Sequence, residues 1–126
     1  MSVELISDER PRARKHHRCF HCGGWIVPGE AHRKSTCKYD YVYSLRIHDD
    51  CEALWKQYES DAGFSFYDFD DGYPPIREEW GNSGEFQSLC DSYRGKFPGP
   101  VTRMEFHEQI SDIKWRDHLA ARGITA

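Results

Sequence analysis

Two short pairs of metal-binding side chains are the most distinctive chemical feature of this sequence. Cys19 and Cys22 are separated by two residues, and His48 and Cys51 repeat that spacing after a gap of 25 residues. Sulfur and imidazole donors in two such pairs are typical of a closed, tetrahedral zinc site. Because five cysteines is an odd number and no secretory segment is evident, a disulfide framework is the weaker interpretation. The spacing therefore predicts one Zn2+ per chain, held by these four residues.

The remaining cysteines and histidines leave one alternative ligand set open. Cys37 could replace His48 in an all-cysteine site. Cys90 belongs to an apolar stripe at helical spacing, which predicts a small core residue. The histidines outside the two pairs are interpreted as part of a solvated basic surface: His16, His17, His21 and His32.

The chain around the two pairs predicts the three elements that must hold the metal. Two glycines follow Cys22, where a tight turn would form a zinc knuckle. Apolar and polar residues alternate over residues 39–48, which indicates a strand with one buried face. Apolar residues then recur at helical spacing from Cys51, with Asp49 and Asp50 in the first turn, where carboxylates are favoured. A knuckle, a β-hairpin and a helix that supplies the last ligand describe a treble-clef-like layout.

Two further helices are expected to complete the fold. One covers residues 83–93, and a capping box at Thr102 and Glu105 marks the start of the second, over residues 102–122, with Arg103 on its solvated face. The fold class is therefore α+β, a small zinc-stabilised, treble-clef-like finger followed by a mainly helical C-terminal part. We expect a single domain over 1–126, made of a flexible basic arm (1–15), a zinc finger (16–60), an acidic aromatic loop segment (61–82) and two helices (83–126).

The finger also resembles a known group of families. The residues that carry the resemblance are the pair Cys19-x2-Cys22, Trp25-Ile26, Gly29-Glu30, the pair His48-x2-Cys51, and Trp55. They are similar to the poly(ADP-ribose) polymerase-type zinc finger, and equally to small zinc proteins of bacteriophages and other mobile elements. The resemblance covers about a third of the chain and implies the same four ligands. It implies DNA-end binding in one lineage, and structural roles or protein contacts elsewhere.

Charge is distributed unevenly along the chain, although the net charge is only −4. Residues 1–38 carry eight basic and four acidic side chains, residues 39–91 carry three and thirteen, and residues 92–126 carry six and four. A polyanion partner is therefore expected only at the ends of the chain. The candidate nucleic-acid-binding residues are Arg10, Arg12, Arg14, Lys15, Arg18, Arg33, Lys34 and Lys38. Binding through them is predicted to be weak, because no recognisable groove-reading helix accompanies them.

An acidic aromatic segment follows the finger. Carboxylates and aromatic side chains interleave there without a helical period. Such a segment can pack as a flap, or it can imitate phosphates and contact a protein partner with a basic surface. The candidate partner-binding residues are Tyr67, Asp68, Phe69, Asp70, Asp71 and Tyr73.

These features favour a non-enzymatic protein-interaction module over an enzyme. The sequence has no phosphate-binding loop, nucleophile elbow or His-Glu-x-x-His motif. We expect a phage or mobile-element factor that binds a host protein that handles nucleic acid, and inhibits or redirects it. A nucleic-acid-binding zinc finger is the alternative function. No apolar run approaches the roughly 20 residues of a membrane helix, so no membrane association and a cytoplasmic location are expected.

Overall fold

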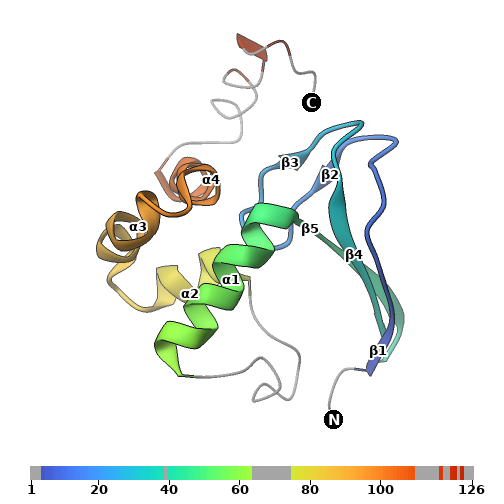
Figure 1. The fold of residues 1–126 in the computed structure, drawn as a ribbon, viewed down its shortest axis with the longest axis horizontal. Coiled ribbons are helices and arrows are strands. Elements are labelled where there is room, and N and C mark those ends of the chain that lie inside the picture. The colour runs from blue at the N-terminus through green and yellow to red at the C-terminus, as the bar shows by residue number, and fades with distance from the viewer. Residues whose placement is uncertain are drawn as a thin grey trace.

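The computed structural model describes residues 4–38, 40–63, 75–109, 117, 120–121 and 123. In this part of the chain two antiparallel sheets combine with helices, which confirms the expected α+β class. The strands gather on one side of the molecule, and α2 (Ile76–Asn82), α3 (Phe86–Arg94) and α4 (Pro98–Gln109) lie on the other. Helix α1 (Asp49–Ala62) runs between them (Figure 1).

The larger sheet has three strands in the order β1–β4–β5. Its members are β1 (Glu4–Glu9), β4 (His32–Lys38) and β5 (Val42–His48). The β4–β5 hairpin pairs His32 with His48 and Lys38 with Val42. The strand predicted over residues 39–48 is therefore present, although it begins at Val42. Two shorter strands, β2 (His17–Arg18) and β3 (Trp25–Ile26), form the second sheet.

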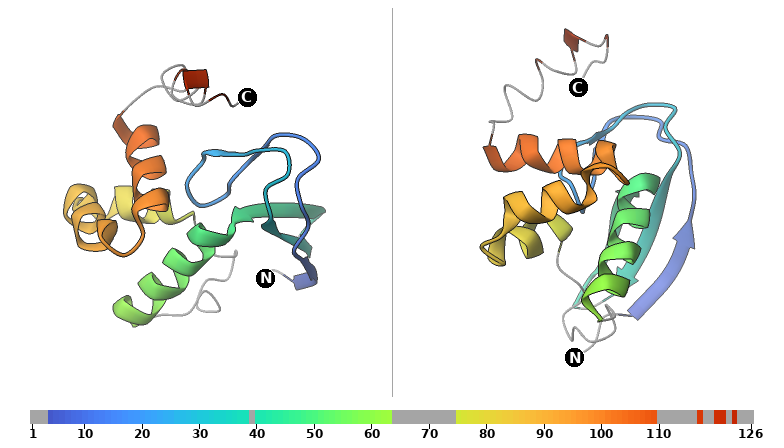
Figure 2. Two further views of the ribbon diagram at one scale, coloured as in Figure 1. Left: turned by 45° about the horizontal axis from the view of Figure 1, so that its top comes forward. Right: turned by 60° about the vertical axis from the view of Figure 1, so that its left-hand side comes forward.

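The two faces of the larger sheet have different environments. Helix α1 lies across one face (Figure 2), where Ser35 is buried and Arg33 reaches Glu52 of the helix. Side chains alternate between the two faces of a strand, so Lys34 points to the opposite face. Its direct partner on β5 is Arg46. The face away from α1 therefore brings basic residues of neighbouring strands together.

Residues 4–9 belong to the sheet, so the expectation of a flexible arm over residues 1–15 is wrong for them. Strand β1 pairs with β4 in antiparallel register, with an irregularity between Leu5 and Ser7. The chain then stays close to the segment before β4, because Arg12 forms a bridge with Ala31 and the Ala13 N–H donates to the Glu30 carbonyl at 3.0 Å. The sequence of β1 lacks a regular apolar alternation, and its partner strand is distant in sequence. Local pattern therefore could not identify it.

Helix α1 forms where the sequence predicts it. Three acidic residues occupy its first turn, where the helix dipole favours negative charge. Leu54 and Trp55 are buried against the core. The helix ends at Ala62 and is capped by Gly63, whose φ of 77° lies in the left-handed region and whose N–H donates to the Glu59 carbonyl at 2.9 Å.

The last two helices have different limits from those predicted. Helix α3 begins at Phe86 rather than at residue 83. Helix α4 begins at Pro98, and Thr102 lies inside it, where its hydroxyl donates to the Pro98 carbonyl at 2.7 Å. The predicted capping box is therefore wrong. Pro98 and Pro100 fit the first turn, because their fixed φ suits a helix and an N–H is not needed there. Most of the predicted remainder, residues 110–122, lies outside the described residues.

Helix α2 occupies the end of the segment that the sequence predicted as a loop. Its apolar residues Ile76 and Trp80 are fully buried. The helix has only seven residues, which is too short for a hydrophobic period to identify it. The helix is therefore explained by the burial of Ile76 and Trp80 rather than by a pattern in its own short sequence.

One hydrophobic core contains residues of the finger and of the C-terminal helices. A row of aromatic rings runs through it, with neighbouring centroids 5.1 to 6.0 Å apart. The rings are those of His21, Trp55, Tyr58, Trp80 and Tyr93. Cys90 is fully buried in the same core, so its prediction as a core residue is confirmed.

Candidate metal centre and basic groove

The four predicted ligands come together in one buried cluster. Their sulfur and ring nitrogen atoms all lie within 4.8 Å of one another, and none of the four residues is more than 4% exposed. Cys19 and Cys22 lie on the turn between β2 and β3, His48 ends β5, and Cys51 lies in the first turn of α1. The cluster could hold one metal ion and is compatible with a single zinc.

The distances around His48 fit a tetrahedral ion. With Zn–S of about 2.3 Å and Zn–N of about 2.0 Å, neighbouring sulfur and nitrogen ligands lie roughly 3.5 Å apart. His48 Nδ1 lies 3.4 Å from Cys22 Sγ and 3.7 Å from Cys51 Sγ. On the other side of the ring, Nε2 lies 2.9 Å from the Trp25 carbonyl and 3.2 Å from the Glu30 carboxylate. A ring that donates its Nε2–H in this way presents an unprotonated Nδ1 to a metal.

Backbone N–H groups point at the sulfur atoms. The Gly24 N–H donates to Cys22 Sγ at 3.3 Å, and the His48 N–H donates to Cys19 Sγ at 3.5 Å. The turn is closed by the Gly23 N–H, which donates to the Cys19 carbonyl at 2.9 Å. Gly23 has a φ of 74°, a conformation that glycine adopts without steric cost. The two glycines therefore form the tight turn that the sequence predicted.

Cys37 is not a member of this cluster. It lies on β4, directly opposite Tyr43. Within the described residues, the cluster has His48 as its fourth member. The geometry therefore favours His48 over Cys37 as the fourth ligand.

Arg103 reaches the cluster from α4, although the sequence placed it on a solvated helix face. Its Nε donates to Cys22 Sγ at 3.3 Å, and its Nη2 donates to Cys51 Sγ at 3.2 Å. Nη2 also donates to the Asp50 carboxylate. Burial acts to lower the pKa of Arg103, but the thiolate charges of Cys51 and Cys22 raise it above its ordinary value. The bonded residues are 81 and 52 positions apart, so no local pattern could reveal the contact.

His21 and His32 are buried, so their interpretation as solvated surface residues is wrong. His21 is 1% exposed, and its Nδ1 accepts a hydrogen bond from the Ile76 N–H at 3.2 Å. Burial lowers the pKa of His21 to about 3, so the ring stays neutral and able to accept. His32 Nδ1 donates to the Glu30 carbonyl at 3.2 Å, and its Nε2 accepts from Arg46 at 2.9 Å. Both rings therefore fix neighbouring segments in place.

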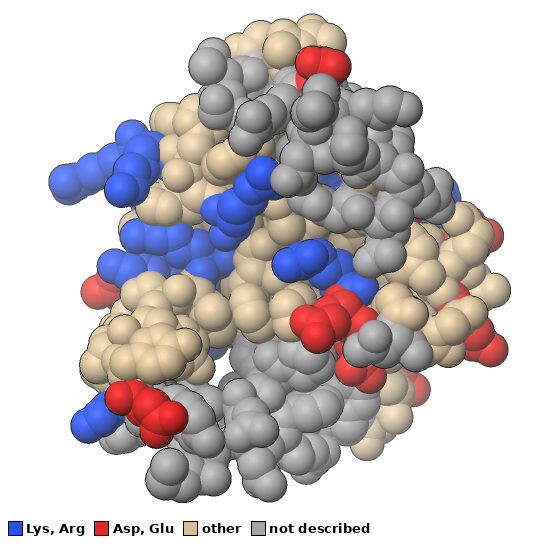
Figure 3. Space-filling view, turned by 180° about the vertical axis from the view of Figure 1, so that it is seen from behind, with Lys and Arg blue, Asp and Glu red and all other residues tan. Residues whose placement is uncertain are grey.

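Basic side chains from several segments line one groove on the strand side of the molecule. The groove has a volume of about 610 Å³ and is lined by Glu9, Pro11, Arg12, Arg14, Lys15, His17, Lys34 and Arg46. Figure 3 shows Lys and Arg side chains gathered on that side. Burial, together with the charges of Arg46 and Lys15, lowers the pKa of His17. Because five of the described lining residues are cationic and one, Glu9, is acidic, the potential in the groove is positive, and the groove can attract a negatively charged ligand.

The structure separates the predicted nucleic-acid-binding residues into two groups. Four of them line the groove: Arg12, Arg14, Lys15 and Lys34. Arg46, which was not among the predicted residues, and His17, which was predicted only as part of a solvated basic surface, also line this groove. Arg18 instead lies over the Trp25 ring at 4.0 Å and donates to the Gly23 carbonyl. Lys38 lies further along β4, at the end of the strand.

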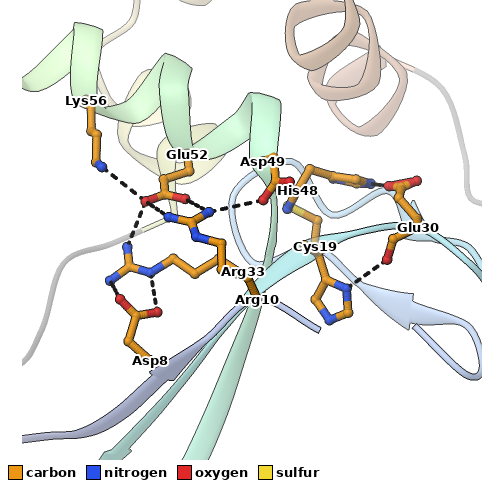
Figure 4. Close-up of polar contacts among 10 residues, drawn as sticks. Asp8, Arg10, Cys19, Glu30, Arg33, His48, Asp49, Glu52 and Lys56 are labelled. Atoms are coloured by element: carbon orange, nitrogen blue, oxygen red, sulfur yellow. Dashed lines mark hydrogen bonds and ion pairs between the residues drawn. The ribbon is translucent and has the colours of Figure 1, made fainter. Parts of the chain in front are cut away.

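Arg10 and Arg33 are held by a buried carboxylate instead. Arg10 donates to both oxygens of Glu52, at 2.6 and 3.0 Å (Figure 4). Arg33 reaches Glu52 at 3.4 Å and donates twice to Asp8 at 2.9 Å. Burial raises the pKa of Glu52, but hydrogen bonds from Arg10 and Lys56 bring it below its ordinary value. These two arginines therefore tie β1 and β4 to α1.

Two other expectations concern the acidic aromatic segment and membrane association. The predicted partner-binding residues lie outside the described residues: Tyr67, Asp68, Phe69, Asp70, Asp71 and Tyr73. Among the residues that are described, no helix has both the length and the apolar character needed to cross a membrane.

Comparisons with protein-family models, curated proteins and solved structures found no match to this chain. The fold and the geometry of the two sites are therefore the basis for assigning a function.

Proposed function

We propose that this protein is a zinc-structured, non-enzymatic protein that binds nucleic acid through its basic groove. The proposed metal is zinc, because three thiolates and an imidazole are the donor types found in tetrahedral zinc sites. Four protein donors fill such a coordination sphere, and all four residues are buried. A catalytic zinc keeps one position for water or substrate. The donor set therefore supports a structural ion.

The finer identity of the finger is part of the same proposal. The ligands come from a glycine turn, the end of a hairpin strand and the start of a helix. This order supports a treble-clef-like finger, and with it the resemblance to poly(ADP-ribose) polymerase-type fingers and small phage zinc proteins. Neither resemblance specifies an activity on its own.

The convergence of basic side chains on the groove is the observation that carries the proposed function. Five cationic residues surround it: Arg12, Arg14, Lys15, Lys34 and Arg46. Among the lining residues that the structure describes, the single carboxylate is that of Glu9. Phosphates bound by such cations release counterions, which is a main source of affinity for nucleic acids. Residues 39–91 contain thirteen of the acidic residues, and none of those that the structure describes is among the groove-lining residues.

The lining of the groove supports contact with phosphates rather than with bases. Within the described part of the chain, the lining residues include no Trp, Tyr or Phe on which a base could stack. They also come from strands and loops, and none of the described helices contributes to the groove. Binding is therefore expected to be insensitive to sequence and to weaken steeply as salt rises.

A protein-interaction module is a second proposal, and it depends on the sequence of the acidic aromatic segment. Carboxylates beside aromatic residues can steer and anchor a basic partner. Replacing Asp68, Asp70 and Asp71 together by Asn should then abolish capture on an immobilised basic protein and leave the zinc content unchanged. Equal capture by the triple variant would remove this proposal.

Removal of two groove charges tests the proposed function. The double variant Arg14→Gln, Lys15→Gln removes two exposed positive charges that line the groove. We expect its affinity for labelled single-stranded and duplex DNA to fall at least about tenfold at low salt, and the slope of log K against log salt to fall by about two. Fluorescence anisotropy between about 50 and about 200 mM salt measures both quantities.

A matched variant controls for charge alone. Lys56→Gln, Lys96→Gln also removes two positive charges, and neither residue lines the groove. We expect this variant to bind almost as the original chain does. Equal weakening by the two double variants, or no binding by the unaltered chain at low salt, would refute the proposed function.

A further inference from the structure

Arg103 connects the C-terminal helices directly to the metal centre. Its guanidinium donates to Cys22 Sγ at 3.3 Å and to Cys51 Sγ at 3.2 Å. The side chain is only 18% exposed, and its neighbours Val101 and Met104 on α4 are fully buried in the core. The guanidinium therefore fills the space between α4 and the cluster.

The charge of the cluster suits this contact. Three thiolates and one divalent ion leave one negative charge, and Arg103 brings one positive charge to it. Hydrogen bonds from a charged donor to a charged acceptor are stronger than neutral ones. The planar guanidinium addresses two different sulfur atoms at once, which a lysine ammonium cannot do in the same fixed geometry. Arg103 therefore matches the metal-bound form of the cluster in both charge and shape.

The first turn of α4 contains a glycine that leaves room for the Arg103–Asp50 pair. A Cβ at Gly99 would lie 3.0 Å from the Asp50 carboxylate and 3.4 Å from Arg103 Nη1. The absence of a side chain at this position leaves room for the pair. A second arginine, Arg94 of α3, donates to the Glu105 carboxylate of α4 at 2.8 Å. Among the described residues, Arg94 bonds to Glu105 and Asp91 and to none of the four cluster residues, so this pair offers a matched control.

We propose that Arg103 is a positioning residue that couples metal retention to the docking of α4. The metal holds the two sulfur atoms at the spacing that the guanidinium recognises, and the guanidinium in turn holds Cys22 and Cys51 around the metal. Loss of the contact loosens both the metal and the helix. This inference rests on the proposed structural zinc and is independent of nucleic-acid binding.

The test compares Arg103→Gln with Arg94→Gln in the zinc-loaded full chain. The first readout is the rate of zinc transfer to a chromogenic chelator, and the second is hydrogen exchange of the α4 amides relative to those of the β4–β5 hairpin. We expect Arg103→Gln to release zinc about 10 to 100 times faster, as changes to the partners of metal ligands do elsewhere. Its α4 amides should exchange faster while the hairpin stays protected. Arg94→Gln should release zinc at nearly the original rate.

Three results would overturn the proposal. They are an unchanged release rate in Arg103→Gln, unchanged exchange of its α4 amides, and equal acceleration of release by Arg94→Gln. If Arg103→Gln does not load with zinc, Arg103→Lys is measured instead. Arg103→Lys keeps the positive charge but lacks the planar guanidinium that bonds to two sulfur atoms. We expect its rate of zinc release and the hydrogen exchange of its α4 amides to be intermediate. Rates equal to those of the unaltered chain would also overturn the proposal. An unaltered chain that binds no zinc would refute the metal site itself, which is a distinguishable result.

Discussion

At the scale of residues, His48 connects the strand, the helix and the metal cluster. It ends β5, precedes α1, and directs Nδ1 at two sulfur atoms while Nε2 faces the Trp25 carbonyl. The four ligands could be predicted because each pair is defined by a spacing of two residues. The orientation of the His48 ring could not be predicted, because the Trp25 carbonyl that fixes it is 23 positions away. The contacts of Arg103 with Cys22 and Cys51 could not be predicted either, because these residues are distant in sequence.

Substitution of His48 separates its role as a donor from its place in the fold. His48→Ala should purify with less than one zinc per chain and should melt early and broadly, because structural zinc supplies about 10 kcal/mol in small fingers. His48→Cys should retain zinc, since four thiolates also form a tetrahedral site. Metal analysis and thermal melting followed by circular dichroism measure both outcomes. Full zinc content in His48→Ala would contradict the assigned ligand.

Glu52 makes a pH-dependent contribution to stability. Its pKa in the folded protein lies below the ordinary value, because its hydrogen bonds with Arg10 and Lys56 outweigh the effect of burial. The contribution is therefore fully present above the unfolded-state pKa of about 4.3 and is lost as the pH falls through the lower folded-state pKa. Glu52→Gln should cost about 1.5 kcal/mol at neutral pH, because the buried carboxylate loses its charge-assisted hydrogen bonds to Arg10 and Arg33.

Urea unfolding at several pH values checks this prediction. The difference in unfolding free energy between Glu52→Gln and the unaltered chain should be constant from neutral pH to about pH 5 and should shrink below about pH 4. The exposed Glu78 on α2 provides the control, because Glu78→Gln should change stability little at any pH. A difference that grows in acid would show that the carboxylate of Glu52 is not stabilising.

At the scale of elements, prediction succeeded where the pattern is local. The β5 strand and α1 have clear periods of two and of 3.6 residues, so their existence followed from sequence. Strand β1 has no such period and depends on pairing with β4 and on the Arg33–Asp8 contact. Helix α2 depends on His21, whose carbonyl accepts from the Arg77 N–H and whose ring accepts from the Ile76 N–H. Both elements are stabilised by non-local partners, which no short stretch of sequence contains.

Removal of β1 tests its role as a strand. Deletion of residues 1–9 should lower stability and increase hydrogen exchange along β4, because it leaves one edge of β4 unpaired and Arg33 without Asp8. The substitution Leu5→Ser, at a residue that is 52% exposed, should have a small effect and serves as the control. Unchanged protection of β4 after the deletion would restore the interpretation of this segment as a flexible arm.

At the scale of the whole molecule, the metal ligands belong to the same core as the helices. Cys19, Cys22 and Cys51 share this core with Ile76 of α2 and Met104 of α4. The fold should therefore respond to metal removal as one unit. Chelation should abolish the near-ultraviolet circular dichroism of the aromatic row and the helical signal in a single transition, and zinc should restore both. Loss of the finger signal alone, with helices intact, would contradict this cooperativity.

The groove depends on that fold, because its lining comes from β1, the chain that follows β1, β2, β4 and β5. Mapping of DNA contacts by NMR therefore tests the central claim most directly. A single-stranded oligonucleotide is titrated into 15N-labelled, zinc-loaded protein at low salt, and the backbone amide shifts are followed. We expect the shifts to cluster at residues 11–17, Lys34 and Arg46, and to disappear as salt rises. Shifts confined to other surfaces, or none at all, would contradict the assignment of the groove as the nucleic-acid-binding site.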